Sequence, residues 1–449
     1  MIIKDIELKN YKGFKDCTIK FHPKVNVFIG NNASGKTSLL TAIVKNLVSI
    51  TTNFAQLNNM INREKMFLSD TDINYNEICC SVKLIIDKFP NYHTKIKSLV
   101  DFGAFFPSEE REDFRKNKMA FIEWYSTYVK TTTSTVPIIK YYHANRGTFD
   151  YLYTSGNRKN YFISQLETWD YIYQDSLSYS SFFKWFLENE TSELRLQRDS
   201  KDLNIENPAL RDVRKALRVA FKKLGYDNVV LKSDQIKRQG NSDLVPVLLL
   251  ENLENKKTED LSHKSDGEKA MISLISDIAY NLSIAKDFIK NDDFLNSPGI
   301  VLIDEIEMHL HPNWQRKIVP ILTEIFPNIQ FFITTHSPQI ISSVKSESIF
   351  LLNKFKAEKV NLKTKGEDTN SILKFIFNST ERPDKYIDLI NKFDTLIEEE
   401  AKPKELEEII KEIKKIDRED LSTPISNLFD ELNIRLEAYK FDIENEKNN

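Results

Sequence analysis

The sequence predicts an α/β protein whose central sheet is mixed, with mainly parallel strands, and whose two halves are separated by a long insertion. Two patterns lead to this prediction. A short apolar strand at residues 25–29 runs through a glycine turn into a helix. Residues 299–352 alternate strand, helix and strand, which is the pattern of a parallel α/β sheet. The stretch between them has a mainly helical pattern, so we expect one domain that is interrupted in sequence.

The expected domain boundaries follow from these patterns. Residues 1–97 and 261–353 are predicted to form a discontinuous head, and residues 98–260 a mainly helical insertion. Residues 354–449 are predicted to form a C-terminal helical region, because an apolar face recurs there at i, i+3, i+4 and i+7. The apolar residues of this face are Leu406, Ile409, Ile410, Ile413 and Ile416.

The composition excludes several classes of protein. Of the 449 residues, 41% are hydrophobic and 29% are charged, so the chain can bury a sizeable core and is not expected to be disordered. A net charge of −3 excludes a globally basic nucleic-acid coat protein. Three cysteines provide neither a disulfide framework nor paired zinc-ligand spacing. Because no membrane span or signal peptide is recognisable, we expect a cytoplasmic protein without membrane contact.

The segment GNNASGKT at residues 30–37 fits the pattern G-x-x-x-x-G-K-[ST] between a strand and a helix. In such a loop, backbone N–H groups point at phosphate oxygens, and the following helix presents its positive end to the same anion. Lys36 is placed to reach the β- and γ-phosphates, and the Thr37 hydroxyl to bind Mg²⁺. The alternative is a glycine-bearing turn without a ligand. The residues predicted to contact ATP are Gly30, Asn31, Asn32, Ala33, Ser34, Gly35, Lys36, Thr37 and Ser38.

A second apolar strand, residues 299–303, ends in the consecutive acids Asp304 and Glu305. Beside the phosphate loop, Asp304 can hold magnesium, directly or through water. Glu305 can polarise the attacking water as a general base, and two acids rather than one favour hydrolysis over nucleotide holding. The alternative is a strand that ends in a solvated acidic turn.

A third strand, residues 329–335, is followed at once by His336, Ser337 and Pro338. An imidazole at this edge can donate a hydrogen bond to the γ-phosphate and sense its loss. Serine followed by proline is also a helix-start signal, so an ordinary capping loop is the alternative.

Glu307, His309 and His311 follow the acidic pair at alternate positions. They can be mistaken for a zinc site, but no cysteine or fourth ligand lies near them in sequence. We interpret this segment as a conformational connector between the nucleotide and the helix that follows.

Ser265, Asp266 and Gly267 open a further helix and form a second end that can receive an anion. One phosphate group seldom needs two such ends from one chain. We therefore predict that Ser265 and Gly267 complete the nucleotide site of a second copy, which makes the protein a homo-oligomer. An ordinary capped helix is the alternative.

Residues 211–238 are locally basic and can meet a phosphate backbone, although a solvated helix face explains the pattern equally well and is preferred. The basic residues are Arg211, Arg214, Lys215, Arg218, Lys222, Lys223, Lys232, Lys237 and Arg238. Tyr141, Tyr142 and Arg146 can contact nucleotide or nucleic acid, but core packing is the preferred interpretation of the tyrosines.

In combination, these motifs resemble those of the ABC-class ATPases of the SMC/RecF-like group. The N-terminal strand pair with GNNASGKT looks like their Walker A region, SDGEK like the signature motif, IVLIDEIEMHLHP like Walker B, and TTHSPQII like the histidine switch. The match covers about residues 1–50 and 261–352. It implies an ABC-type P-loop ATPase head that binds ATP and Mg²⁺ and pairs head to head.

Within that group, the chain resembles most the stand-alone bacterial anti-phage ATPases of the PtuA (Septu) and AriA (PARIS) types. The similar segments are PIIKYYHANRG at 137–147 and GEDTNSILKFIFNSTERP at 366–383. The resemblance implies a sensor that controls a separately encoded nuclease or toxin, with DNA or a phage protein as candidate triggers. No fused nuclease is expected. A RecF-like DNA-repair ATPase and a slowly hydrolysing, ATP-gated scaffold are the alternative functions.

Overall fold

The computed structural model describes residues 1–51, 72–74, 77, 79–87, 92–97, 137–144, 179–237, 244–286, 294–377, 384–399, 401–416 and 430–441. The chain divides into two units, Met1–Ile372 and Leu373–Asn449. Along the described residues, no helix combines the length and the apolarity that a membrane crossing needs.

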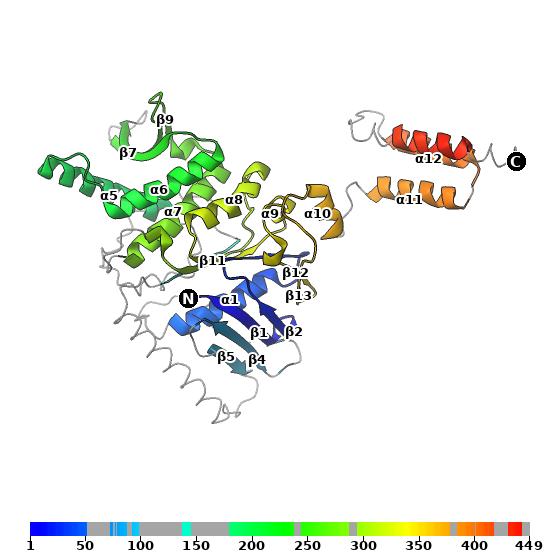
Figure 1. The fold of residues 1–449 in the computed structure, drawn as a ribbon, viewed down its shortest axis with the longest axis horizontal. Helices are drawn as coiled ribbons and strands as arrows, with labels where there is room; N and C mark the ends of the chain where they lie inside the picture. The colour runs from blue at the N-terminus through cyan, green and yellow to red at the C-terminus, as the bar shows by residue number, and fades with distance from the viewer. Residues whose placement is uncertain are drawn as a thin grey trace. The chain divides into compact units, whose positions relative to one another are not determined.

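A six-stranded sheet with the order β13–β12–β3–β11–β10–β6 lies at the centre of the first unit (Figure 1). All neighbours pair in parallel except β13, which is antiparallel to β12. This arrangement confirms the predicted α/β fold with a mixed, mainly parallel sheet. Its strands are β3 (Val25–Ile29), β6 (Ile138–Tyr142), β10 (Gly299–Ile303), β11 (Ile329–Thr334), β12 (Ile349–Asn353) and β13 (Lys356–Lys359).

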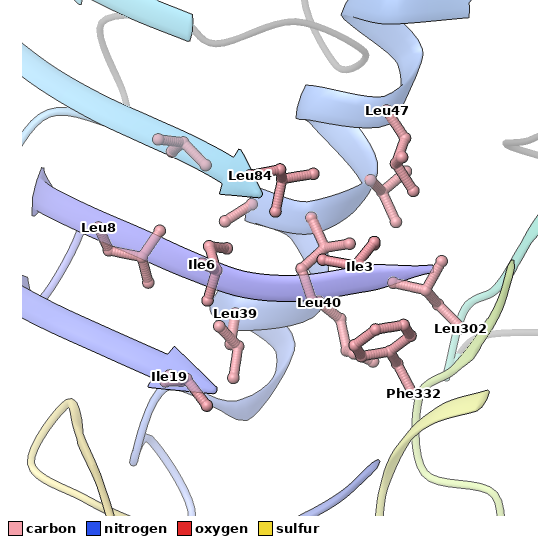
Figure 2. Close-up of a cluster of buried hydrophobic side chains, with 14 of the residues drawn as sticks. Ile3, Ile6, Leu8, Ile19, Leu39, Leu40, Leu47, Leu84, Leu302 and Phe332 are labelled. Carbon is pink, nitrogen blue, oxygen red and sulfur yellow. The ribbon is translucent and has the colours of Figure 1, made fainter. Parts of the chain in front are cut away.

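An antiparallel sheet with the order β2–β1–β4–β5 covers the other side of helix α1 (Lys36–Thr51). Its strands are β1 (Ile3–Tyr11), β2 (Phe14–Lys20), β4 (Cys79–Ile86) and β5 (Tyr92–Lys97). Figure 2 shows side chains of α1 between those of β1 and those of the parallel sheet; the labelled contributors include Ile6, Leu40, Leu302 and Phe332. Truncating a buried leucine to alanine in such a core costs about 2–5 kcal/mol. The helix that follows the phosphate loop is therefore held on both sides.

The predicted insertion contains more strand than its sequence pattern indicates. Strand β6 pairs in parallel with β10, so residues 138–142 belong to the head sheet and not to the insertion. A further antiparallel sheet, with the order β7–β8–β9, follows α6 in the chain. Short apolar runs cannot be assigned to strand or helix by periodicity alone, which explains the missed strands. The elements are α5 (Tyr179–Ser200), α6 (Pro208–Leu224), β7 (Val229–Lys237), β8 (Leu244–Asn252) and β9 (Thr258–Asp260).

Helix α7 (Asp266–Lys286) is anchored to the head sheet by a buried hydrogen bond. The Tyr142 hydroxyl, at the end of β6, donates to the Asp277 carboxylate at 2.7 Å. Helix α8 (Pro312–Ile325) follows β10, and α9 (Pro338–Ile341) follows β11. Both begin with proline, whose fixed φ and missing N–H suit the first helical position.

The C-terminal unit begins later than the sequence pattern suggests. Residues 356–359 form β13 and pair with β12, so this part of the predicted C-terminal region belongs to the head sheet. Beyond α10 (Thr369–Phe375), the described residues are helical, with α11 (Asp384–Glu398) and α12 (Pro403–Ile416). Leu406, Ile409 and Ile410 of the predicted apolar face are buried together with Leu389, Phe393, Leu432 and Leu436.

Candidate functional site

Three loops follow neighbouring parallel strands and lie at one edge of the large sheet. They are the phosphate loop after β3, the acidic turn after β10, and the histidine loop after β11, which lies between the other two strands. The carboxyl ends of parallel strands share an edge, and open α/β sheets bind their ligands there. The topology therefore gathers the three motifs that are far apart in sequence.

The backbone of the phosphate loop adopts a shape that favours glycine. The φ angles of Gly30, Ala33 and Gly35 are 145°, 61° and 106°. A Cβ atom on Gly30 would lie 2.2 Å from the Leu352 carbonyl oxygen, and one on Gly35 would lie 2.7 Å from the Phe355 ring. Positive φ and close packing thus both require the two glycines.

The polar groups of this loop suit an anion. The buried Lys36 ammonium donates to the carbonyl oxygens of Gly30 at 2.9 Å and Asn31 at 3.0 Å. Burial lowers the pKa of Lys36, whereas the carboxylates of the acidic turn raise it in part. The Ser34 hydroxyl is buried and has no hydrogen-bond partner within the described part of the chain. A phosphate oxygen would satisfy this donor. Asn31, Asn32 and Ala33 are exposed, and Ser38 is half-buried.

A chain of hydrogen bonds joins the phosphate loop to the other two loops. The Thr37 hydroxyl donates to Asp304 Oδ2 at 2.9 Å, and the Thr334 hydroxyl donates to Asp304 Oδ1. Asp304 is 1% exposed. This carboxylate therefore lies beside the first turn of α1, where both hydroxyl and carboxylate oxygens are the hard ligands that Mg²⁺ prefers.

Glu305 has an uncommon backbone conformation. Its φ is 48°, in the left-handed region that residues other than glycine rarely adopt. Its N–H donates to the Thr334 hydroxyl at 2.8 Å, and this bond holds the turn against β11. Such strain persists only where the surroundings impose it, and it is frequent at functional sites.

His336 lies next to the same acidic turn. Its backbone N–H donates to Glu307 Oε1. Burial lowers the pKa of the imidazole, the Lys36 charge lowers it further, and the carboxylates of Glu307, Glu305 and Asp304 raise it in part. The imidazole is therefore neutral near pH 7 and has one N–H to donate.

The helix end formed by Ser265 and Gly267 makes a capping box with its own side chains. The Ser265 hydroxyl and N–H donate to Glu268 Oε2 at 2.7 and 2.9 Å, and the Glu268 N–H donates back to the hydroxyl at 3.3 Å. Glu268 Oε1 also accepts a hydrogen bond from the Tyr226 hydroxyl. These hydrogen bonds of Ser265 thus remain within its own helix.

Gly267 packs against the segment that follows the acidic turn. A Cβ atom at this position would lie 2.3 Å from the His309 carbonyl oxygen. His309 itself has a φ of 65°, and His311 caps α8 by accepting from the Asn313 N–H at 3.3 Å. In the described residues, no group of three or more His, Cys, Asp or Glu side chains is arranged to hold a metal ion. The start of α7 and the turn after β10 are therefore in contact.

The basic residues of 211–238 are partly paired within the fold. Arg214 forms salt bridges with Glu190 and Glu193 at 2.8 and 2.6 Å, and Lys223 forms one with Glu324 at 3.0 Å. These pairs support the interpretation of a structural, solvated surface. Arg238 and Arg146 lie outside the described residues. Tyr141 and Tyr142 are buried in β6, so core packing accounts for both.

Sequence reasoning gave no individual role to Thr334 or Phe355, although both contact the motifs. Thr334 bridges Asp304 and Glu305, and Phe355 donates its N–H to the Ser34 carbonyl oxygen at 3.2 Å. A hydroxyl residue at the end of a mainly apolar strand was the available signal for Thr334. Phe355 had no comparable signal, because its contact depends on the β12–β13 turn.

Two family models match the chain. One, described as "AAA domain, putative AbiEii toxin, Type IV TA system", matches residues 82–342, and one described as "AAA domain" matches residues 1–74. The chain is 30% identical over 451 residues to the Retron Ec83 probable ATPase of Escherichia coli, covering 88% of this chain and 80% of that protein.

A second relative of similar extent is the Retron Vc95 probable ATPase of Vibrio cholerae serotype O1 biovar El Tor. It is 28% identical over 443 residues, which cover 88% of this chain and 83% of the relative. The Septu protein PtuA of Bacillus mycoides (strain KBAB4) is 37% identical over 136 residues, or 30% of this chain and 16% of that protein. The similarity to the two retron ATPases therefore extends through the regions between the motifs.

Proposed function

The chain belongs to the AAA-domain family whose model spans residues 82–342, and from this premise we propose that it is a Mg²⁺-dependent ATPase that controls a separate effector protein. It is an ATPase related to those of retron and Septu systems. The observation that carries the proposed chemistry is the shared sheet edge, where Lys36, the Thr37–Asp304 pair, Glu305 and His336 come together.

The residues at this edge fit a magnesium ion. Thr37 Oγ1 and Asp304 Oδ2 are 2.9 Å apart and provide the oxygen donors that would hold it. When bound, the ion would neutralise negative charge on the nucleotide phosphates.

Each remaining residue has a role that its environment supports. Lys36 and the N–H groups of the phosphate loop bind the phosphates of ATP, and Ser34 donates to a phosphate oxygen. Glu305 accepts a proton from the attacking water. The neutral imidazole of His336 donates to the γ-phosphate and loses this contact after hydrolysis.

The site is completed by a second copy of the chain. Ser265 and Gly267 lie at the start of α7, beside the turn that follows the acidic pair. In a head-to-head pair, they face the nucleotide held by the phosphate loop of the other copy. ATP then stabilises the pair, because it binds only the assembled state at full strength.

The names of the relatives support a role for this chain in anti-phage defence. Retron and Septu ATPases are the proteins with which this chain shares sequence. The effector in this proposal is a separately encoded nuclease or toxin. The nucleotide bound to the ATPase determines whether this effector is released or restrained. Co-expression with the neighbouring gene product tests this: effector toxicity should differ between the wild-type chain and a hydrolysis-deficient variant.

Glu305→Gln tests the chemistry. The variant keeps the shape and one acceptor oxygen of the side chain but cannot accept the proton, so phosphate release should fall by about 10²-fold or more. Binding of ATP, measured by fluorescence titration, should change little. Unchanged phosphate release in this variant would remove Glu305 from the mechanism.

A further inference from the structure

Glu307 connects two loops of the site, and the proposed chemistry leaves it without a role. Strands β10 and β11 run side by side, with Ile303 opposite Ile333. Beyond them, the Ile306 N–H donates to the Thr334 carbonyl oxygen at 3.2 Å, so the acidic turn continues along the histidine loop. Next along these two loops, the Glu307 carboxylate accepts a hydrogen bond from the backbone N–H of His336.

This contact restrains the backbone nitrogen of the residue that carries the imidazole. A hydrogen bond from a backbone N–H to an ionised carboxylate is stronger than one between neutral groups. It restrains the His336 backbone directly after β11. Without it, the loop would keep its connection at Ser337, whose hydroxyl caps α9, but not the one at the histidine.

The second carboxylate oxygen indicates that Glu307 is more than a structural link. Oε2 is buried and has no hydrogen-bond partner within the described residues. A buried charged acceptor that is only half-satisfied destabilises the folded state. The Glu307 carboxylate lies close enough to Lys36 and His336 for its charge to act on both. Burial chiefly lowers the pKa values of these two residues, and this carboxylate raises them in part.

We propose that Glu307 is a positioning residue for the proposed ATPase reaction, which holds the His336 backbone so that the imidazole is aimed at the γ-phosphate of bound ATP. The inference rests on the proposed function. It assigns to Glu307 an effect that passes through His336, and not the role of a second general base beside Glu305.

Two substitutions separate the hydrogen bond from the charge. Glu307→Gln retains an acceptor oxygen for the His336 N–H, so the turnover number should remain within about 5-fold of wild type. Glu307→Ala removes the acceptor, and a misplaced imidazole should lower the turnover number by about 10-fold to 100-fold. The KM for ATP should change by less than about 2-fold, since the phosphate loop is untouched. A glutamine variant as slow as the alanine variant would overturn the proposal.

A double-mutant cycle tests whether the effect passes through the histidine. In a His336→Ala background, Glu307→Ala should lower the rate by less than about 2-fold further, because residues that act as one unit are not additive. Full additivity would contradict the proposal, since Glu307 would then act by itself. Glu324→Ala is the matched control: it removes a glutamate from α8 whose partner is the half-exposed Lys223.

Amide hydrogen exchange provides a readout that does not require hydrolysis. In the nucleotide-free protein, exchange at His336 should become at least about 10-fold faster in Glu307→Ala and stay unchanged in Glu324→Ala. Unchanged exchange at His336 in Glu307→Ala would contradict the proposal that Glu307 restrains the His336 backbone. A wild-type chain that releases no phosphate would instead overturn the proposed function, while exchange at His336 would still report on the bond.

Discussion

The two helix ends predicted from the sequence to receive an anion differ in how their polar groups are satisfied. At the start of α1, the Ser34 hydroxyl has no partner in the described residues, and Lys36 is buried among carbonyl oxygens of its own loop. At the start of α7, the Ser265 hydroxyl is engaged by Glu268, which Tyr226 holds from the other side. The first end is ready for a ligand, whereas the second is closed by its own cap.

In the proposed pair, the two ends have different roles. The phosphate loop would bind nucleotide within one copy, and the α7 end would have to exchange its internal hydrogen bonds for contacts to the nucleotide of another copy. A capping box contributes about 0.5–2 kcal/mol, which contacts to a phosphate would offset. Under the proposed function, closure of the pair would then depend on ATP.

Disrupting the contact between Gly267 and His309 should have the largest effect on the position of the α7 end. In Gly267→Ala, the new methyl group would lie 2.3 Å from the His309 carbonyl oxygen, so α7 must shift away from the turn after β10. We expect a loss of about 1–3 kcal/mol in the free energy of unfolding and a fall in ATPase rate of at least about 10-fold. Urea unfolding and phosphate release measure the two effects.

Gly225→Ala is the matched control for that substitution. Gly225 has a φ of 95° and open space around it, so a methyl group there strains the backbone without displacing a neighbour. Stability should fall by about 1 kcal/mol while the ATPase rate remains that of the wild type. Equal activity losses in the two variants would show that destabilisation alone explains the effect of Gly267→Ala.

Glu268→Gln tests the cost of opening the cap. Glutamine also forms a capping box, so the free energy of unfolding should change by less than about 0.5 kcal/mol. The substitution removes a negative charge from the end that receives a phosphate, and the protein concentration for half-maximal ATPase activity should fall by about 2-fold to 5-fold. A rise in that concentration would indicate that the Glu268 charge assists assembly.

The pH dependence of stability provides the smallest predicted effect. Burial lowers the pKa of His336 in the folded state, so the unfolded chain binds its proton first as the pH falls. The contribution of His336 is complete above its ordinary pKa of 6.5 and is lost as the pH falls through the lower folded value. The difference in stability between pH 7.5 and pH 5.5, from urea titrations, should therefore be smaller in His336→Gln than in wild type.

His22 is a useful comparison in the same titrations. Burial also lowers its pKa, while the nearby Glu347 raises it in part. His22→Gln should reduce the pH dependence in the same direction but leave the ATPase rate unchanged, because this residue lies at the opposite end of the sheet, before β3. An effect of His22→Gln on turnover would show that stability and activity cannot be separated by this route.

The site was predictable from sequence where its signals are local. A glycine pattern between a strand and a helix identifies residues 30–37, and two acids directly after an apolar run identify Asp304 and Glu305. The role of Thr334 depends on β11 lying between β3 and β10, and this strand order is not written in any short segment. The same limit applies to β6, whose apolar residues fit a helix or a strand equally well until its pairing with β10 is known.

Mixing two inactive variants tests the composite site most directly. Lys36→Ala lacks the phosphate-loop ammonium, and Ser265→Arg places a bulky cation where the nucleotide of a second copy must approach. A two-fold pair formed from one of each has one site with both lesions and one site with neither. An equal mixture should therefore recover about a quarter of the wild-type ATPase rate, since half of randomly formed pairs are mixed. A Ser265→Arg protein that alone hydrolyses ATP at the wild-type rate would contradict the composite site, because the α7 end would then have no part in the reaction.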